Sequence, residues 1–460
     1  MSDSLSSIST QSSHPYPPAA VGWYATIMLA FLYWISVLDR YIISLLVDPI
    51  KRDLDLTDVQ FGVLHGFAFV LTFVFFGGVF GALADRVNRR RLIYIGVTIW
   101  SIGTAFCGLA QNFTHLLLAR VGVGAGESAL QPCATSMISD LFPREKLTTA
   151  MAVYSIGSTV GSGTALIVGG VIVGIAAGMG DVVLPIVGLV RPWQIVFFIV
   201  GLPGLLLALS IFTVPEPVRH DRHQANTANR PWYVSYFDLW SFMKSKPRFY
   251  ICHYGGFTLA SAVITGNAAW LPAHMIRSFG WEAARVGWAL GMTTMIGAIA
   301  GKLLCGVLVD MMYRRGRRDA QLRWYATCML LATPVGILGM TSGNPYVFLI
   351  GHGLIQVLIS PMPACAFSSL NLVTPNELRG TGIAIFTTVM GVIGAGAGSV
   401  LIAAISDHIY GGGATLGLGM ATLIGLCCPL AALLLFLGFK SMREALVKAE
   451  AIPTKTPVLS

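Results

Sequence analysis

The chain has 460 residues, of which 55% are hydrophobic and only 11% are charged. Soluble proteins carry about 25% charged residues, so this composition excludes a soluble protein of several domains and favours a polytopic membrane protein. The formal net charge of +9 would suit a nucleic-acid partner, but the distribution of the charges along the chain argues against one.

Residues 1–21 form a polar start to the chain. They are rich in serine and proline and contain no lysine or arginine. They therefore lack the basic start and apolar centre of a cleaved signal peptide, and we predict a disordered tail. Residues 440–460, after the last apolar stretch, are predicted to form a second tail.

Twelve apolar stretches follow the first tail, each about long enough to cross the ~30 Å core of a bilayer as a helix. They lie near 22–47, 59–82, 92–111, 114–138, 147–174, 193–214, 249–272, 284–309, 323–342, 345–370, 379–405 and 415–439. The sequence therefore predicts an all-α polytopic membrane protein of twelve transmembrane helices in two six-helix halves. The halves cover 22–214 and 249–439, and a polar linker over 215–248 joins them.

Lysine and arginine concentrate on one side of the predicted spans. With the N-terminus inside, the inner loops and tails hold 22 of the 30 basic residues, the outer loops hold five, and three lie within spans. Because basic residues mark the cytoplasmic side, we predict that both termini are cytoplasmic. The positive charge is then an orientation signal and a contact for lipid headgroups, and no nucleic-acid partner is expected. We expect the protein in a bacterial inner membrane.

One short pattern occurs twice, about half a chain length apart. Gly81, Asp85 and Arg89 recur as Gly306, Asp310 and Arg314, an offset of 225 residues (310 − 85), each time just after a long apolar stretch. The repeat indicates two related halves. Internal repeats of this kind, with a binding site at their interface, are typical of secondary transporters.

The residues of the first copy point to a family. Gly81, Asp85, Arg86, Arg89 and Arg90 resemble the loop 2–3 signature of the major facilitator superfamily, although Asn88 stands where a glycine is usual. The second copy is weaker, because Met311 and Tyr313 replace a basic residue and a glycine. The resemblance covers nearly the whole chain and implies the superfamily's twelve-helix fold.

Two further stretches narrow the resemblance. Asp39-Arg40-Tyr41-Ile42, and the run from Arg120 to Glu127 followed by Asp140, look most like the spinster-type transporters, which are associated with lysolipids and sphingoid phosphates. The organic-anion symporters of the superfamily share several of these features, so a lysolipid-like molecule and an aromatic or sugar acid both remain open as substrates.

The resemblance also implies a gate on the cytoplasmic side. Asp85 is expected to contact the start of segment eleven, where unpaired backbone N–H groups favour an anion. Arg89 is expected to reach Asp140 at the foot of segment four. Gly81, Arg86 and, more weakly, Asp310 complete the set of predicted gating residues.

Four ionisable residues lie within predicted spans of the first half, namely Asp39, Arg40, Arg120 and Glu127. Placing each of them alone at the centre of a membrane-spanning helix would cost about 2.5–3.5 kcal/mol, so we expect them to have partners or a function. At about 1.5 Å per residue, Asp39 and Arg120 lie at similar depths, and we predict that they form an ion pair.

Glu127 lies near the predicted midplane, with no equally deep partner in its own half. Desolvation favours the neutral form of a carboxyl group, which is the property that a proton carrier needs. We therefore predict that Glu127 exchanges a proton while Asp39, Arg40 and Arg120 change partners. The alternative is a permanent ion-pair cluster that only holds segments one and four together.

The second half offers candidate substrate contacts. Lys302 either extends toward the inner surface or faces the central cavity. In the second case Lys302 and Arg40 would present cations from opposite halves, which favours an anionic substrate. Asn267, Trp270 and Gln356 are further candidates, although such residues also form interhelix hydrogen bonds or pack in the core.

No nucleophile–base motif and no nucleotide-binding loop occurs in the sequence, so an enzyme is not expected. A channel or a non-transporting sensor is less favoured, because no charged rings or output domain are present. We predict a monomeric, gradient-driven and proton-coupled transporter without cofactor or metal. It would move an amphipathic or anionic small organic molecule across the membrane by alternating access.

Overall fold

The computed structural model describes residues 16–84, 87–185, 188–218, 232–375 and 378–450. Its first half contains α1 (Ala19–Ile42), η1 (Ile43–Leu45), α2 (Val47–Leu54), α3 (Asp58–His65), α4 (Phe67–Ala84), α5 (Arg89–Cys107), α6 (Phe113–Glu127), α7 (Leu130–Leu141), α8 (Arg144–Met179), β1 (Val182–Leu184), β2 (Gly188–Val190), α9 (Pro192–Ser210) and η2 (Ile211–Thr213).

The second half begins after the linker helix α10 (Trp232–Ser245). It contains α11 (Pro247–Phe279), α12 (Ala283–Arg314), α13 (Ala320–Met340), α14 (Pro345–Ile359), α15 (Met362–Val373), α16 (Arg379–Val389), the π-helix η4 (Met390–Ala395), α17 (Gly396–Ile409), η5 (Gly413–Thr415) and α18 (Leu416–Glu450). The all-α architecture predicted from the sequence is confirmed, with one small hairpin added.

Several predicted spans are built from more than one helix. α3 and α4 meet at Gly66, and α14 and α15 meet at Ser360–Pro361, where proline cannot donate a backbone hydrogen bond. Counted as continuous spans, eight segments of the described chain are long and apolar enough to cross a membrane. Adding α5, α6 with α7, α11 and α13, whose polar residues lower their hydropathy, gives the predicted twelve (8 + 4).

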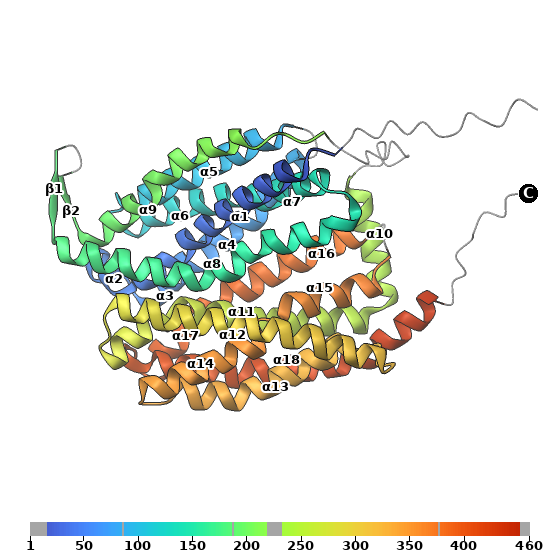
Figure 1. Cartoon of the computed structure of the whole chain (residues 1–460). Helices are drawn as coiled ribbons and strands as arrows, with labels where there is room; N and C mark the ends of the chain where they lie inside the picture. Colours follow the sequence, from blue (N-terminus) through green and yellow to red (C-terminus); the bar gives the residue numbers. More distant parts are fainter. Residues whose placement is uncertain (1–15, 85–86, 186–187, 219–231, 376–377, 451–460) are drawn as a thin grey trace, which may run out of the picture.

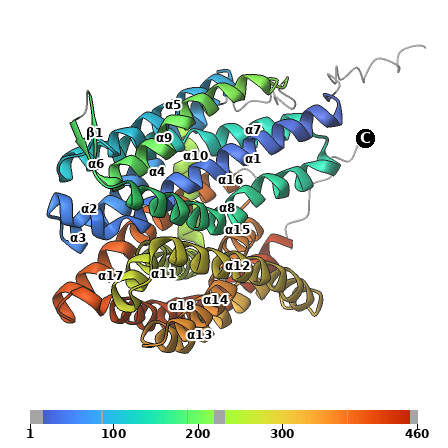
Figure 2. The same cartoon turned by 60° about the vertical axis from the view of Figure 1, so that its left-hand side comes forward.

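The two halves stack side by side, with the helices of both running along one common direction (Figures 1 and 2). The β1–β2 hairpin marks one end of the bundle, which we call the hairpin end. Helix α10 and the C-terminal end of α18 mark the opposite end, which we call the linker end. Neither the hairpin nor α10 was predicted from the sequence.

Local sequence explains where the helices begin. Thr57 caps α3 by a reciprocal pair of hydrogen bonds with Gln60, 3.1 Å to the backbone N–H of Gln60 and 2.9 Å back to that of Thr57. Asn112 accepts from the backbone of His115 at 2.9 Å and starts α6 in the same way. Each cap provides a hydrogen-bond acceptor for a backbone N–H group that has no partner within its own helix.

Glycines allow the halves to approach closely near the hairpin end. A Cβ atom on Gly291 of α12 would lie 2.3 Å from the carbonyl oxygen of Gly163 in α8. A Cβ on Gly287 would lie 2.2 Å from that of Leu166. On the opposite side of the seam, the hydroxyl of Ser399 in α17 donates to the carbonyl of Gly62 in α3 at 2.9 Å. Small residues therefore let helix backbones of the two halves touch.

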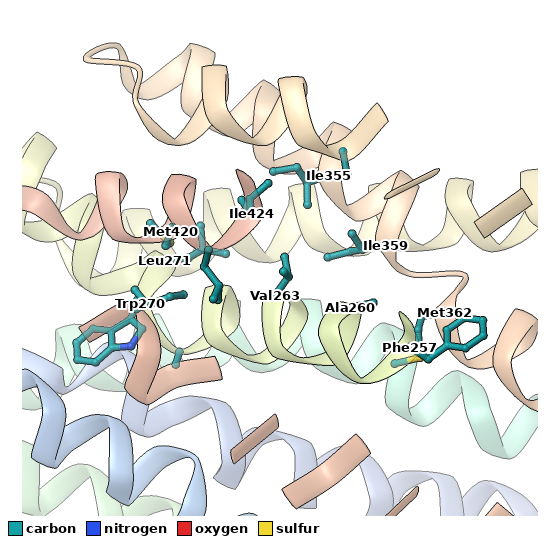
Figure 3. Packing of buried hydrophobic residues seen from close by; sticks show 14 of the residues in the cluster. Phe257, Ala260, Val263, Trp270, Leu271, Ile355, Ile359, Met362, Met420 and Ile424 are labelled. Atoms are coloured by element: carbon teal, nitrogen blue, oxygen red, sulfur yellow. The ribbon is translucent and has the colours of Figure 1, made fainter. Parts of the chain in front are cut away.

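The second half has a continuous apolar core around α11. Figure 3 shows Val263 and Leu271 of α11 on the side of the helix that faces Ile355 of α14 and Ile424 of α18, with Phe257 farther along α11. All five side chains are buried. The second half is therefore held together by apolar packing between α11, α14 and α18.

Candidate functional site

Polar residues of α1 and α6 meet between apolar helices of the first half. The carboxylate of Glu127 accepts from the guanidinium of Arg40 at 2.6 Å and from the hydroxyl of Ser36 at 2.8 Å. The side chain of Glu127 is fully buried, whereas that of Arg40 remains 31% exposed. Glu127 was predicted to have no equally deep partner in its own half, and the structure corrects this by placing Arg40 beside it.

Asp39 and Arg120 lie in the same cluster but do not pair. Both carboxylate oxygens of Asp39, and Nε and Nη2 of Arg120, are buried without a hydrogen-bond partner in the described part of the chain. The guanidinium of Arg120 instead faces the ring of Phe69, 5.5 Å from its centroid. The predicted Asp39–Arg120 ion pair is therefore wrong for this state. Matching heights along two helices did not determine which side chains meet.

Two phenylalanines of α4 lie against Arg40. The guanidinium carbon of Arg40 is 4.7 Å from the ring centroid of Phe69 and 5.3 Å from that of Phe73. Contacts of this kind stabilise a cation that has lost part of its water. They also place the guanidinium of Arg40 beside Phe73, which lines a cavity.

This cavity lies between the two halves, with Tyr236 of α10 in its wall at the linker end, and we call it the linker-end cavity. Its volume is about 570 Å³. It is lined by Phe73, Val74, Gly77 and Gly78 of α4, Ser128, Gln131, Pro132 and Thr135 of α7 and the turn before it, Tyr236 of α10, and Ala384, Ile385, Thr387, Thr388 and Val389 of α16. The described residues of the lining are apolar or carry hydroxyl and amide groups, and none of them is charged, so Arg40 is a cation beside a neutral lining.

At the hairpin end the halves are joined by charges, which we call the hairpin-end ion network. Arg277 of α11 donates two hydrogen bonds to the carboxylate of Asp58, at 2.8 and 3.0 Å, and one to Asp48 at 2.7 Å. Lys51 also contacts Asp58. Paired N–H···O bonds between a guanidinium and a carboxylate are among the stronger polar contacts. Lys51 and Arg277 are two of the five basic residues that the sequence assigns to the outer loops, and their acidic partners were not predicted.

At the linker end a second set of charges lies within the first half. Arg89 is buried and donates to Asp140 at 2.5 Å and to Glu216 at 2.9 Å, and it also bonds Ser136. The predicted contact between Arg89 and Asp140 is thus present. Glu216 was missed, because it follows the sixth span by a few residues and belongs to no motif.

The other predicted gating residues that the structure describes, Gly81 and Asp310, have fewer contacts than Arg89 and Asp140. Gly81 has no atom within 4 Å of the place where a Cβ would stand, and Asp310 is exposed. Asp310 lines a separate polar pocket at the linker end, together with Gln321, Asn371 and Arg379. Asp85 and Arg86 lie outside the described residues, and so do residues 376–377, which precede segment eleven.

The predicted substrate contacts of the second half are distributed differently. Trp270 is fully buried and donates to the backbone of Ser399 at 2.8 Å, so it packs between α11 and α17. Gln356 lies against Gly297 of α12. Lys302 is exposed on α12. These three do not line the linker-end cavity.

Asn267 differs from the other three. Its side chain is buried, and neither polar atom has a hydrogen-bond partner among the described residues. A buried amide without partners is costly, typically about 1–3 kcal/mol. Asn267 therefore remains a candidate for a polar contact in another state of the protein.

Comparison with known proteins identifies the family to which the chain belongs. A model of the Major Facilitator Superfamily matches residues 29–399. An MFS-type efflux pump of Mycolicibacterium smegmatis is 26% identical over 407 residues, covering 87% of this chain and 88% of that protein. Protein spinster homolog 1 of Xenopus laevis is 26% identical over 415 residues, covering 84% of this chain and 73% of that protein.

A solved structure agrees with the fold. The crystal structure of a bacterial homolog of the human lysosomal transporter Spinster, in an inward-facing and unoccupied conformation, matches with a TM-score of 0.75 at 23% identity. The match covers 94% of this chain and 99% of that chain. Proteins of this family and fold are transporters of small molecules rather than enzymes. The chain therefore belongs to the major facilitator superfamily of multi-pass membrane transporters, and it resembles the spinster-type members.

Proposed function

We propose that this protein is a proton-coupled transporter of amphipathic organic anions. The observation that carries the proposal is the contact between Arg40 and Glu127 at the edge of the linker-end cavity. Arg40 is bound to a buried acid on one side and is partly exposed on the other. A proton on Glu127 and an anion beside Arg40 would therefore favour each other.

The coupling follows from charge balance. When Glu127 is ionised, its carboxylate neutralises Arg40 and leaves little attraction for a substrate anion. When Glu127 takes up a proton, the guanidinium loses its counter-ion, and an anionic head group can replace it. Proton and anion then bind together and cross together, which is symport. Asp39, whose two oxygens have no hydrogen-bond partner among the described residues, is a second acid for this exchange.

The cavity supports the substrate class. Next to Arg40 lie the rings of Phe69 and Phe73, and beyond Phe73 the cavity walls are mainly apolar. A molecule with an anionic head and an apolar tail would place the head at Arg40 and the tail along α4 and α16. A lysolipid-like anion fits this arrangement better than a sugar acid, whose hydroxyl groups would meet few polar partners.

The orientation in the membrane is part of the proposal. The excess of basic residues in the loops at the linker end supports a cytoplasmic position for that end and for both termini. The hairpin-end ion network joins the halves on the opposite side. The state described here is then closed to the outside and open to the cytoplasm. The efflux pump of a bacterium among the relatives supports an inner-membrane location.

Transport in liposomes tests the proposal. Protein is reconstituted in vesicles, and uptake of a fluorescent single-chain lysophosphatidic acid is followed with and without an imposed proton gradient. We expect the gradient to accelerate uptake by the wild type. Glu127→Gln should abolish the response to the gradient while retaining exchange of labelled for unlabelled substrate. Glu444→Gln, at an exposed position on α18, is the control and should behave as wild type.

Two results would overturn the proposal. Wild-type dependence on the proton gradient in Glu127→Gln would show that this acid is not the proton carrier. Preference for an aromatic carboxylate or a sugar acid over the lysophosphatidic acid, measured as competition for uptake, would assign the cavity to a smaller and more polar anion.

A further inference from the structure

Helix α10 combines two apolar faces, although it belongs to a polar linker. One face packs on the protein, because Leu239 is fully buried and Phe242 and Met243 contact the main hydrophobic core. Tyr236 lines the linker-end cavity. In Figure 1 the helix lies at the linker end and runs across the direction of the membrane-spanning helices.

The opposite face of α10 is also aromatic. The side chain of Phe237 is 68% exposed and that of Trp240 is 56% exposed. A helix whose outer face meets water normally carries polar residues there. Aromatic side chains are instead enriched where a membrane meets water, because their rings tolerate both headgroups and acyl chains. The outer face of α10 therefore has the chemistry of a membrane interface.

Basic residues follow this aromatic face directly. The ammonium group of Lys244 lies 5.4 Å from the ring centroid of Trp240, and that of Lys246 lies 4.7 Å from the ring of Phe242. Arg248, at the start of α11, is exposed. Three cations within five residues, beside exposed aromatic rings, complement the phosphates of anionic lipids.

We infer that α10 is an interfacial helix that binds the anionic phospholipids of the leaflet at the linker end. Phe237 and Trp240 insert among the upper acyl-chain carbons, and Lys244 and Arg248 bind the phosphates. Because Tyr236 of the same helix lines the cavity, bound lipid would hold one wall of the cavity in place. The inference does not depend on the identity of the transported molecule.

Fluorescence quenching tests the position of the helix. The contribution of Trp240 is obtained as the difference between wild type and Trp240→Phe in vesicles. Phospholipids brominated near the headgroup should quench that difference signal strongly, and aqueous iodide should quench it weakly. Strong quenching by iodide with no quenching by brominated lipid would place α10 in water, as expected for a helix that binds a soluble partner, and would overturn the inference.

Lipid selectivity tests the role of the cations. We expect phosphatidylglycerol to raise the melting temperature of the detergent-purified wild type more than phosphatidylcholine does. The double variant Lys244→Gln, Arg248→Gln should lose that difference. Lys440→Gln, which removes an exposed cation on α18, is the matched control and should keep it. An unchanged preference for phosphatidylglycerol in the double variant would contradict the assignment, and the quenching measurement on Trp240 remains decisive if that variant does not fold.

Discussion

Replacing Arg277 with glutamine should open the hairpin end of the transporter. The side chain of Arg277 is only 13% exposed and that of Asp58 only 3%, so their contact is largely withdrawn from water. Breaking a buried ion pair costs about 3–5 kcal/mol. Here Lys51 would still neutralise Asp58, and Asp48 is partly exposed. We therefore expect Arg277→Gln to destabilise the closed hairpin end relative to the open one by about 2 kcal/mol. That free-energy change lowers the ratio of closed to open molecules roughly thirtyfold.

The assay measures that ratio directly. Spin labels on Asp55→Cys in the first half and Glu282→Cys in the second half, both exposed at the hairpin end, report the distance between the halves. Arg277→Gln should move population from a short to a longer distance. Arg285→Gln is the control, because Arg285 stacks on Trp281 within its own half.

Charge exchange provides the refutation. The double variant Arg277→Asp, Asp58→Arg restores opposite charges across the seam and should recover at least part of the short distance. An unchanged distance distribution in Arg277→Gln would mean that glycine-mediated packing of α8 on α12 closes this end without the ion network. An exchange variant that stays open would mean that the paired geometry, rather than charge alone, is required.

Two further predictions concern packing. Arg89→Ala leaves Asp140 and Glu216 without their shared cation and should lower the melting temperature of the purified protein by several degrees, whereas an unchanged value would make this network dispensable. Gly291→Ala places a methyl group against the backbone of α8 and should reduce transport at least tenfold. Gly306→Ala, on the same helix with nothing within 4 Å, should transport normally, and equal rates in the two variants would refute the role of close approach.

The number and order of the membrane-spanning helices could be predicted from the sequence, because each span must bury its backbone polar groups as a helix. Asp39, Arg40, Arg120 and Glu127 were also identifiable, because a charged residue within a membrane-spanning segment is costly unless it has a partner or a function. Their pairing was not predictable. Counting residues compares the heights of Cα atoms, whereas the guanidinium of Arg40 lies several bonds away and reaches Glu127.

Contacts between distant segments had no local signal. Arg277 and Asp58 are 219 residues apart, and nothing near either residue indicates the other. Helix α10 was not predicted for a different reason. The linker is polar on average, and its aromatic residues lie within the 14 residues of this helix. The family motif predicted the contact of Arg89 with Asp140, but it did not predict the second acidic partner of Arg89, Glu216.

The π-helix η4 divides one membrane-spanning segment into two parts with different surroundings. On one side of it, α17 is attached to α3 through Ser399. On the other side, α16 lines the linker-end cavity. A π-turn weakens the regular hydrogen-bond pattern and is a natural place for a helix to bend. If the segment bends at η4, we expect the 11 residues of α16 to move over the linker-end cavity while α17 stays attached to α3.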